Sequence, residues 1–500
     1  MTIPKLLAFI LALAITVAGA FASFAEDKPA AHAEDKPAQN QPAKGILRLL
    51  PGDSVTEHAI DTSQGRLGYT ATAGTLAFYD QSGEQSASVF YTAYVLKNGD
   101  KDRPLTFVFN GGPGAAAAFL HLGLVGPRIL DLGPEARDFA HAQLRDNPDT
   151  WLRFTDLVMI DPIGTGWSRA AKQDDAKHFW NADSDASSMA KAIALYVAHN
   201  NRASSPKYLF GESYGGFRAA RTARAMQREQ GMSASGIVML SPLIEGWLTF
   251  GDDESALRAA LELPSLAAAE LERKHAFSRE ALAGAEKFAM TDYLTTLAAA
   301  PPQGEAARAF YQRVAQVTGL PLDQVTQQRG FVTDAFIKSL QANKIVSRYD
   351  AAFAVDDPFP ERRAGRAPDP ILDGVSRAYG GAFAVYARNE LGFKTEMTYD
   401  LLAKVDWDWH GGRQNAGVES DLRVLLSFDP SFRVLIAHGY SDLVTPYAMT
   451  RYLLDHMPDF TPPGRAQLKL YRGGHMIYLD PASRKAFSTD AAAFYRGEKS

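Results

Sequence analysis

Short apolar runs, separated by polar and helical stretches, are the main pattern of the chain after residue 104. They occur at 105–109, 157–160, 207–210, 236–240 and 432–437. Each run is short and almost continuously apolar, as a strand buried on both faces requires. Helical periodicity lies between several of them, most clearly at 186–198 and 217–228. Strands that alternate with helices predict a mostly parallel sheet covered by helices on both faces.

Two other regions have different patterns. From residue 67, aromatic and β-branched residues alternate with small ones, which predicts antiparallel hairpins. From 246 to 420, Ala, Leu, Glu and Arg dominate and strand signals are scarce, which predicts a helical insertion. An insertion of this size above the strand ends would form a lid that shapes a substrate pocket. The alternative is an independent helical domain with no part in catalysis.

The amino-terminal residues have the pattern of an export signal followed by a tether. Lys5 precedes an apolar run at 6–20, and small residues then offer cleavage after Ala22 or Ala25. An uncleaved membrane anchor is the alternative, but the run is shorter than the ~20 residues that a spanning helix needs. Residues 23–45 are rich in Ala, Pro, Lys and Glu and contain AEDKPA twice, which predicts a disordered linker.

These patterns together predict the domain organisation. We expect a signal peptide at 1–22, the linker at 23–45, a core in two parts at 46–245 and 421–500, and the helical cap at 246–420 between them. The mature protein is expected to be periplasmic or secreted, with no stable membrane insertion after signal cleavage.

Composition and net charge limit the classes of molecule that the protein is expected to bind. The net charge of −5 gives no basic surplus for neutralising phosphates, which argues against nucleic acid and favours a neutral or peptide-like substrate. The chain has no cysteine, which excludes disulfides and thiolate metal sites. Export without disulfides is most easily reconciled with a bacterial periplasmic or secreted protein.

The sequence GESYG at 211–215 is the sharpest chemical signal. It follows the strand predicted at 207–210 and precedes the helix predicted at 217–228, which is the context of a nucleophile elbow. Its glycines avoid collisions in the strained turn that exposes the serine. The pattern predicts Ser213 as a nucleophile, and the alternative is an ordinary strand-to-helix turn.

A serine nucleophile needs a histidine base and an acid that orients the base. In enzymes whose nucleophilic serine lies in such a strand-turn-helix elbow, the acid and then the histidine follow the serine along the chain. His475 lies on a Gly-rich loop after a strand-like run, whereas His456 lies in a predicted helix. Asp442 ends the segment RVLIAHGYSD and is the predicted acid, while His438 in the same segment is interpreted as a satisfied polar residue at the strand end.

Acyl transfer also needs donors for the oxyanion. One predicted donor is the backbone N–H of Tyr214, which follows the nucleophile, and the other comes from the turn NGGPG at 110–114. A phosphate loop is the competing interpretation of these glycines. It is disfavoured because Pro113 has no N–H and no G-K-[ST] pattern is present.

Several motifs in order resemble the serine carboxypeptidase family. The resemblance spans about 67–246 and 432–480 and implies an α/β-hydrolase fold. The motifs are NGGPG at 110–114, GPRIL from 126, DNP near 147, DPIGTGWS at 161–168, GESYGG at 211–216, HGYSDLVTP around 442 and GGHM around 475.

The resemblance implies roles for further residues. Gly112 and Tyr214 would supply the oxyanion donors, and Asn110, Gly111 and Glu212 would bind the C-terminal carboxylate of a peptide. Because two carboxylates repel each other, Glu212 can donate to this carboxylate only while it is protonated. The alternative for Glu212 is a structural role in the elbow.

Three positions depart from the family pattern. Val108 stands where the family usually has a tryptophan, the run at 115–118 replaces a cysteine and serines with alanines, and Leu124 replaces an acidic residue. None of these changes touches the three residues predicted for catalysis.

The predicted function is therefore a serine carboxypeptidase that acts on peptides through an acyl-enzyme and needs no cofactor or metal. An esterase or acyltransferase that uses the same triad is the alternative, because fold does not fix function. A non-catalytic binding protein is a third reading. It is disfavoured because the chain retains Ser213, Asp442 and His475.

Overall fold

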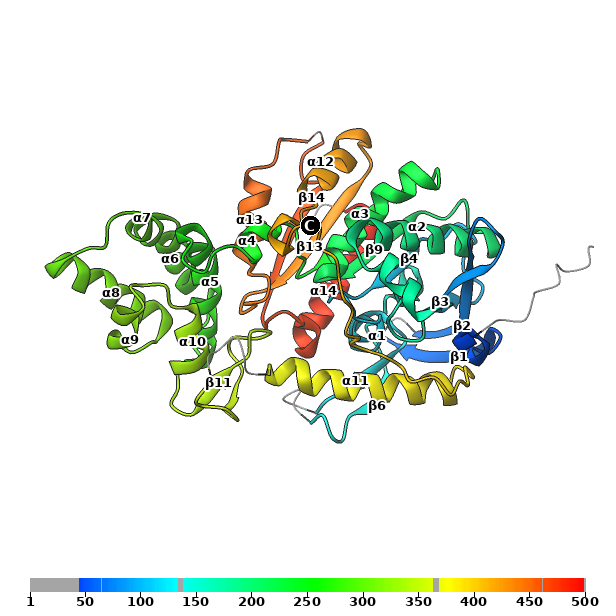
Figure 1. The fold of residues 1–500 in the computed structure, drawn as a ribbon, viewed down its shortest axis with the longest axis horizontal. Coiled ribbons are helices and arrows are strands. Elements are labelled where there is room, and N and C mark those ends of the chain that lie inside the picture. Colours follow the sequence, from blue (N-terminus) through cyan, green and yellow to red (C-terminus); the bar gives the residue numbers. More distant parts are fainter. Residues whose placement is uncertain (1–44, 64, 134–137, 363–367, 461, 499–500) are drawn as a thin grey trace, which may run out of the picture. The chain divides into compact units, whose positions relative to one another are not determined.

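A mixed sheet of ten strands runs through the centre of the protein (Figure 1). The structure, a computed structural model, describes residues 45–63, 65–133, 138–362, 368–460 and 462–498. The predicted signal peptide, and the linker up to residue 44, lie outside the described residues. The strands are β1 (Ser54–Thr62), β2 (Gly65–Tyr79), β3 (Gln85–Leu96), β4 (Leu105–Phe109), β7 (Asp156–Ile160), β8 (Arg169–Ala170), β9 (Lys207–Glu212), β10 (Gly236–Leu240), β13 (Arg433–Gly439) and β14 (Ala466–Tyr471).

The larger part of this sheet is parallel. Its order is β1-β2-β3-β7-β4-β9-β10-β13-β14, and all neighbours from β7 to β14 are parallel. The five strands predicted from apolar runs correspond to β4, β7, β9, β10 and β13, and the first four are buried at every position. The mostly parallel sheet predicted from the sequence is confirmed.

The antiparallel part lies at one edge. β2 and β3 form the long hairpin expected from residue 67 onward, and β3 pairs antiparallel with β7 and β8. β1 was not predicted. It is an edge strand in which only Ile60 is buried, so its sequence carries little apolar signal. A separate two-stranded sheet pairs β5 (Arg128–Asp131) with β6 (Gln143–Asp146).

Helices cover both faces of the sheet, and alternate strand residues point to the two faces. Phe107 and Leu209 pack in one apolar core, whereas their neighbours Val108 and Phe210 pack in the other. The first core is covered by α2 (Ala182–His199), α3 (Tyr214–Glu229), α12 (Glu419–Phe428) and α13 (Tyr447–Asp455). The second is covered by α1 (Ala118–Leu120), α11 (Pro370–Asn389) and α14 (Pro481–Arg496).

Several short helices complete the core. They are η1 (Gly45–Leu49), η2 (His121–Val125), η3 (Trp151–Arg153), η4 (Gln173–Phe179), α4 (Gly246–Thr249), η7 (Arg413–Asn415) and η8 (Ile477–Leu479).

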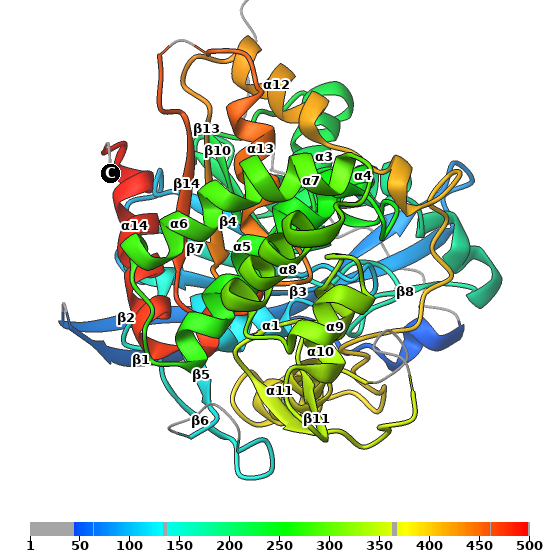
Figure 2. The same ribbon diagram turned by 90° about the vertical axis from the view of Figure 1, so that its left-hand side faces the viewer.

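The region predicted as a helical insertion has two parts that pack differently. Its first part has its own apolar core. Figures 1 and 2 show that the helices of this part group to one side of the sheet. This part also packs in the first core of the sheet, through Leu261, Leu282 and neighbouring residues. The later helix, α11, packs in the second core. The first part contains α5 (Ala256–Arg273), α6 (Arg279–Phe288), η5 (Ala289–Tyr293), α7 (Leu294–Ala298), α8 (Gly304–Thr318), α9 (Leu322–Gln327), α10 (Thr333–Ser339) and the hairpin β11 (Lys344–Val346) to β12 (Ala354–Asp356).

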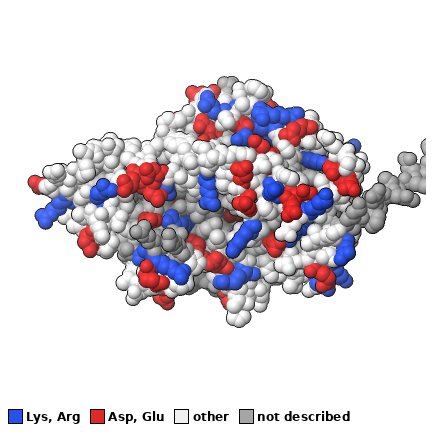
Figure 3. Space-filling view, viewed as in Figure 1, with Lys and Arg blue, Asp and Glu red and all other residues white. Residues whose placement is uncertain are grey.

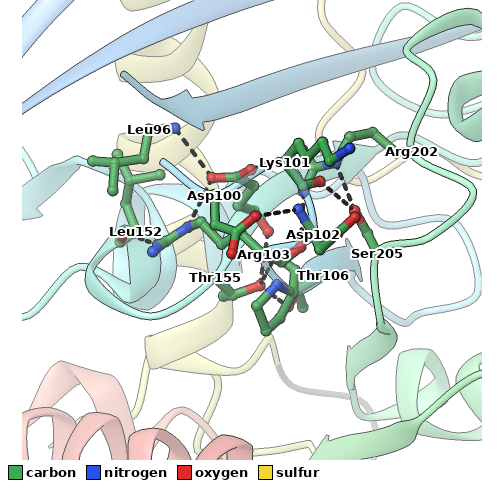
Figure 4. A network of polar contacts seen from close by, with 12 residues as sticks. Leu96, Asp100, Lys101, Asp102, Arg103, Thr106, Leu152, Thr155, Arg202 and Ser205 are labelled. Atoms are coloured by element: carbon green, nitrogen blue, oxygen red, sulfur yellow. Dashed lines mark hydrogen bonds and ion pairs between the residues drawn. The ribbon is translucent and has the colours of Figure 1, made fainter. Parts of the chain in front are cut away.

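A network of paired charges lies at the amino ends of the parallel strands (Figure 4). Arg202 and Arg103 donate to the two carboxylate oxygens of Asp156, at 2.8 and 3.1 Å. Arg202 also donates to the hydroxyl of Ser205 at 2.7 Å and to the backbone oxygen of Arg103 at 2.9 Å. Because the charges are buried and mutually satisfied, this network fixes the starts of β4, β7 and β9.

The surface carries both signs of charge. On the face shown in Figure 3, basic and acidic side chains are interspersed and do not gather into a large patch of one sign. No helix within the described ranges has the length and apolar character that crossing a membrane requires.

Candidate active site

Ser213 occupies a sharp turn between β9 and α3. Its φ of 62° and ψ of −127° are strained for a residue other than glycine. The turn is tight enough that a Cβ on Gly211 would lie 1.9 Å from the backbone oxygen of Gly215. The backbone N–H of Ser213 donates to Leu240 of the neighbouring strand at 2.9 Å. The turn therefore holds Ser213 at the carboxyl end of the sheet.

His475 and Asp442 lie on the loops that follow β14 and β13, and both are almost completely buried. His475 Nδ1 lies 2.9 Å from Asp442 Oδ2. The other oxygen of Asp442 accepts the backbone N–H groups of Val444 and Thr445 at 2.7 and 3.0 Å. The carboxylate is thus fixed by its own turn, with one oxygen left to orient the imidazole.

The environment of His475 adjusts its basicity. Burial is the largest single influence and acts to lower the pKa of His475, but the charge and hydrogen bond of Asp442, together with the nearby Glu212 and Asp369 carboxyl groups, raise the pKa above its ordinary value of 6.5. An imidazole stabilised in this way is a stronger proton acceptor, which suits a general base.

Thr445 adds a contact that the sequence did not indicate. Its hydroxyl lies 2.9 Å from Asp442 Oδ2, 3.2 Å from His475 Nδ1 and 2.9 Å from the backbone oxygen of Ser241. Thr445 belongs to the motif HGYSDLVTP, so the sequence showed that it lies close to Asp442 in the chain. The sequence did not indicate its contact with His475, because a threonine three residues after an aspartate is common in turns.

A segment of the insertion fixes the two loops that carry Asp442 and His475. The backbone N–H of His475 donates to the backbone oxygen of Tyr349 at 2.6 Å, and the two rings meet edge to face at 5.1 Å. Asp350 accepts the hydroxyl of Ser441 at 2.6 Å. The N–H of Leu443 donates to the backbone oxygen of Arg348 at 3.0 Å. No periodicity in the sequence predicted these contacts.

Glu212 is buried beside Asn110 and Tyr478. The amide of Asn110 donates to Glu212 Oε2, and the hydroxyl of Tyr478 lies 3.2 Å from each carboxylate oxygen. Burial raises the pKa of Glu212 to about 7. Glu212 is therefore protonated in mildly acidic solution and can act there as a hydrogen-bond donor.

These groups meet at one pocket of about 220 Å³. Asp442 lies behind His475 and does not line it. The two loops that carry the predicted oxyanion donors touch, since a Cβ on Gly111 would lie 2.6 Å from the backbone nitrogen of Tyr214. The predicted site residues that line the pocket are Asn110, Gly111, Gly112, Glu212, Ser213, Tyr214 and His475.

The insertion contributes part of the pocket wall. The contributing residues lie before and after the helices α5 to α10, and none of the lining residues comes from those helices themselves. Trp409 is among them and packs 5.6 Å from the ring of Tyr214, whereas Trp407 packs at 5.1 Å without lining the pocket. The insertion residues that line the pocket are Phe250, Tyr349, Leu372, Leu402, Trp409 and Arg413.

Several residues considered from the sequence lie away from the pocket. Arg218 is buried, pairs with Asp185 at 2.7 Å and donates to the backbone oxygen of Asn110, which gives it a structural role. His438 is buried with its Nε2 2.8 Å from the hydroxyl of Thr450. His456 is exposed at the end of α13.

The departures from the family pattern also differ in location. Val108 and Leu124 are completely buried in the apolar core and do not line the pocket, whereas Ala115 does. Among the residues that the structure describes, no group of three or more His, Asp or Glu side chains is arranged to hold a metal ion.

Comparisons with known proteins agree with this geometry over part of the chain. Residues 67–244 match the family model described as serine carboxypeptidase. The retinoid-inducible serine carboxypeptidase of Mus musculus is 32% identical over 142 residues, which are 27% of this chain and 28% of the relative. Serine carboxypeptidase-like 5 of Arabidopsis thaliana is 24% identical over 226 residues, 43% of this chain and 47% of the relative. These matches thus span between about a quarter and a half of each relative's length.

A solved structure extends the likeness of the fold. A prohormone-processing carboxypeptidase from Saccharomyces cerevisiae superposes with a TM-score of 0.53 at 15% identity, over 86% of this chain and 91% of that one. At this identity the superposition shows the fold alone. The described chain has the α/β-hydrolase fold, and residues 67–244 match the serine carboxypeptidase family model.

Proposed function

We propose that this protein is a serine carboxypeptidase that removes C-terminal residues from peptides through an acyl-enzyme. The observation that carries the proposal is the pairing of His475 with Asp442 at 2.9 Å, in a pocket that His475 shares with the strained Ser213. The family match over 67–244 supports the same activity.

The proposed reaction begins with proton transfer from the Ser213 hydroxyl to His475 while the serine oxygen bonds to the carbonyl carbon of the last amide. The imidazolium is stabilised by Asp442. The carbonyl oxygen becomes an oxyanion and accepts hydrogen bonds from the backbone N–H groups of Gly112 and Tyr214. When the tetrahedral intermediate collapses, the C–N bond breaks and His475 returns the proton to the leaving amine.

Water completes the cycle. His475 takes a proton from water as the water oxygen bonds to the acyl carbon, and the ester bond to Ser213 then breaks. The serine oxygen regains a proton from His475, and the shortened peptide leaves as a carboxylic acid. Each half-reaction therefore uses the same base and the same oxyanion donors.

The proposed binding site for the substrate's C-terminal carboxylate consists of Asn110, Gly111 and Glu212. The support is their common place in the pocket and the raised pKa of about 7 that burial gives Glu212. A protonated Glu212 donates a hydrogen bond to the carboxylate, whereas an ionised Glu212 repels it. Peptide binding should weaken as the pH rises through 7.

The test uses an N-blocked dipeptide and its C-terminal amide, incubated with the mature protein and with Ser213→Ala and followed by mass spectrometry. We expect loss of the last residue from the free acid, none from the amide, and none from either with Ser213→Ala. Cleavage of both peptides at equal rates would contradict a requirement for the free carboxylate.

An esterase or acyltransferase that uses the same triad is the second candidate. The observation in its favour is that Val108 stands where the family usually has a tryptophan, and Val108 lies in the apolar core and adds nothing to the pocket wall. Intact peptides together with Ser213-dependent cleavage of a simple ester would favour this candidate.

We also propose that the protein is exported, to the periplasm or outside the cell, and acts there on peptides rather than on nucleic acid. The support is the apolar run at 6–20 followed by small residues, and a net charge of −5. Sequencing the amino terminus of the mature protein tests this. A start at residue 23 or 26 is expected, and a start at residue 1 would contradict export by cleavage.

A further inference from the structure

The pocket contains a positive charge that the proposed reaction does not use. Apart from two tyrosine phenols, the ionisable side chains that line it are Glu212, His475 and Arg413. The first two are buried, whereas Arg413 is exposed and therefore lies at the pocket's solvent edge. Arg413 comes from the short helix η7, near the end of the insertion.

Two aromatic rings hold the Arg413 side chain without neutralising it. Its guanidinium carbon lies 5.7 Å from the ring of Phe250 and 5.9 Å from the ring of Trp409, and both rings line the same pocket. Within the described parts of the chain, Arg413 forms no ion pair with a carboxylate. Contact with ring faces leaves the N–H groups in the guanidinium plane available to a ligand.

The backbone beneath Arg413 is fixed. A Cβ on Gly246 would lie 2.0 Å from the backbone oxygen of Arg413, so η7 packs directly on α4. The N–H of Gly246 donates to the backbone oxygen of Ala416 at 2.6 Å, and the N–H of Ala416 donates to the backbone oxygen of Arg413 at 3.2 Å. Because the backbone is already fixed, only the Arg413 side chain has to be ordered on binding, which lowers the entropy cost of a specific contact.

We propose that Arg413 binds a side-chain carboxylate of the substrate, so that the enzyme prefers peptides with Glu or Asp next to the scissile bond. This inference rests on the proposed function. The C-terminal carboxylate already has Asn110, Gly111 and Glu212, and an arginine matches a second carboxylate with two parallel hydrogen bonds. Leu124 and Val108 add neither charge nor a polar group to the pocket.

The experiment measures kcat and KM for N-blocked dipeptides that carry Glu or Gln at the last or the penultimate position. Wild-type enzyme should prefer Glu over Gln about tenfold at one of the two positions, as expected for a hydrogen-bonded charge pair. Arg413→Gln should abolish the preference through KM with little change in kcat, and Arg413→Glu should reverse it. The two positions show on which side of the scissile bond Arg413 acts.

Arg313→Gln is the matched control. Arg313 lies 5.5 Å from the ring of Phe288 in the insertion, so it makes the same kind of aromatic contact but does not line the pocket. Its substitution should leave the ratio of Glu to Gln unchanged. The inference is overturned if Arg413→Gln keeps the wild-type ratio. It is also overturned if Arg413→Gln slows Glu and Gln peptides equally, because Arg413 would then serve the main chain or the fold.

N-blocked nitrophenyl esters of Glu and Gln separate this inference from the proposed function. If wild-type enzyme cleaves the esters but no free-acid peptide, the carboxypeptidase proposal fails while the ester ratio still tests Arg413 on the acyl side of the scissile bond. If peptides are cleaved and Arg413→Gln changes no Glu-to-Gln ratio, only the inference about Arg413 fails.

Discussion

Two buried carboxyl groups at opposite ends of the parallel strands, Asp156 and Glu212, have opposite surroundings. At the amino ends, Asp156 is paired with both Arg103 and Arg202, so each buried charge has an opposite charge beside it. At the carboxyl ends, Glu212 is buried among neutral donors, and burial raises its pKa to about 7. The first arrangement satisfies charges, and the second leaves a carboxyl group able to change its protonation state.

A second carboxyl group at the carboxyl ends shows the same property. Asp161 accepts the N–H of Ala117 at 2.8 Å, but its other oxygen is buried and has no partner within the described structure. Burial raises the pKa of Asp161 to about 6. Together with the strained backbone of Ser213, these features show that backbone strain and raised carboxyl pKa values occur at the carboxyl ends of the strands, where the pocket lies.

The largest expected effect is a loss of activity, without a loss of stability, when a residue at the carboxyl ends of the strands is changed. Ser213→Ala should lower kcat at least about 10⁴-fold, because the nucleophile is removed. The free energy of unfolding should change by less than about 1 kcal/mol, since the hydroxyl is not needed by the turn. Ester hydrolysis and urea denaturation measure the two quantities. Retention of activity would place the nucleophile elsewhere.

The next largest effect is a loss of stability, without a loss of activity, when a residue at the amino ends of the strands is changed. Asp156→Asn should lower the free energy of unfolding by about 3–5 kcal/mol, because Arg103 and Arg202 then stay partly or fully buried without a counter-charge. The kcat of the remaining folded enzyme should be unchanged. Urea denaturation measures the loss. Asp61→Asn is the control, because its pair with Arg66 is exposed and is worth less than about 1 kcal/mol.

The smallest effect depends on pH. In the folded protein Glu212 keeps its proton up to about pH 7, whereas in the unfolded chain it ionises near its ordinary pKa of 4.5. The unfolded state therefore binds fewer protons between these values, and stability must fall as pH rises from about 4.5 to about 7. Glu212→Gln should remove this fall, on the order of 3 kcal/mol.

Unfolding free energies at pH 5 and pH 8 measure the Glu212 effect, with the exposed Glu305→Gln as the control. In wild-type enzyme KM for a free-acid peptide should also rise with pH, whereas KM for a neutral ester should not. Equal pH dependence in wild type and Glu212→Gln would show that Glu212 is not the titrating group.

The sequence anticipated the parallel sheet well because each central strand is apolar at nearly every position. It missed β1, where polar residues reflect an edge position. The sequence pattern grouped α11 with the rest of the insertion, although α11 packs in the second core of the sheet. The amphipathic pattern of a helix does not indicate which surface the helix covers.

For the site, the sequence by itself determined the local devices: the elbow around Ser213, the turn that carries Asp442 and the glycine loop before His475. Each depends on residues close together along the chain, so a short pattern records it. The tertiary structure alone decided that Tyr349 supports His475 and that Arg413 lines the pocket. Such contacts join segments that are far apart in the sequence. The packing of two segments against each other produces no periodic pattern in the sequence of either segment.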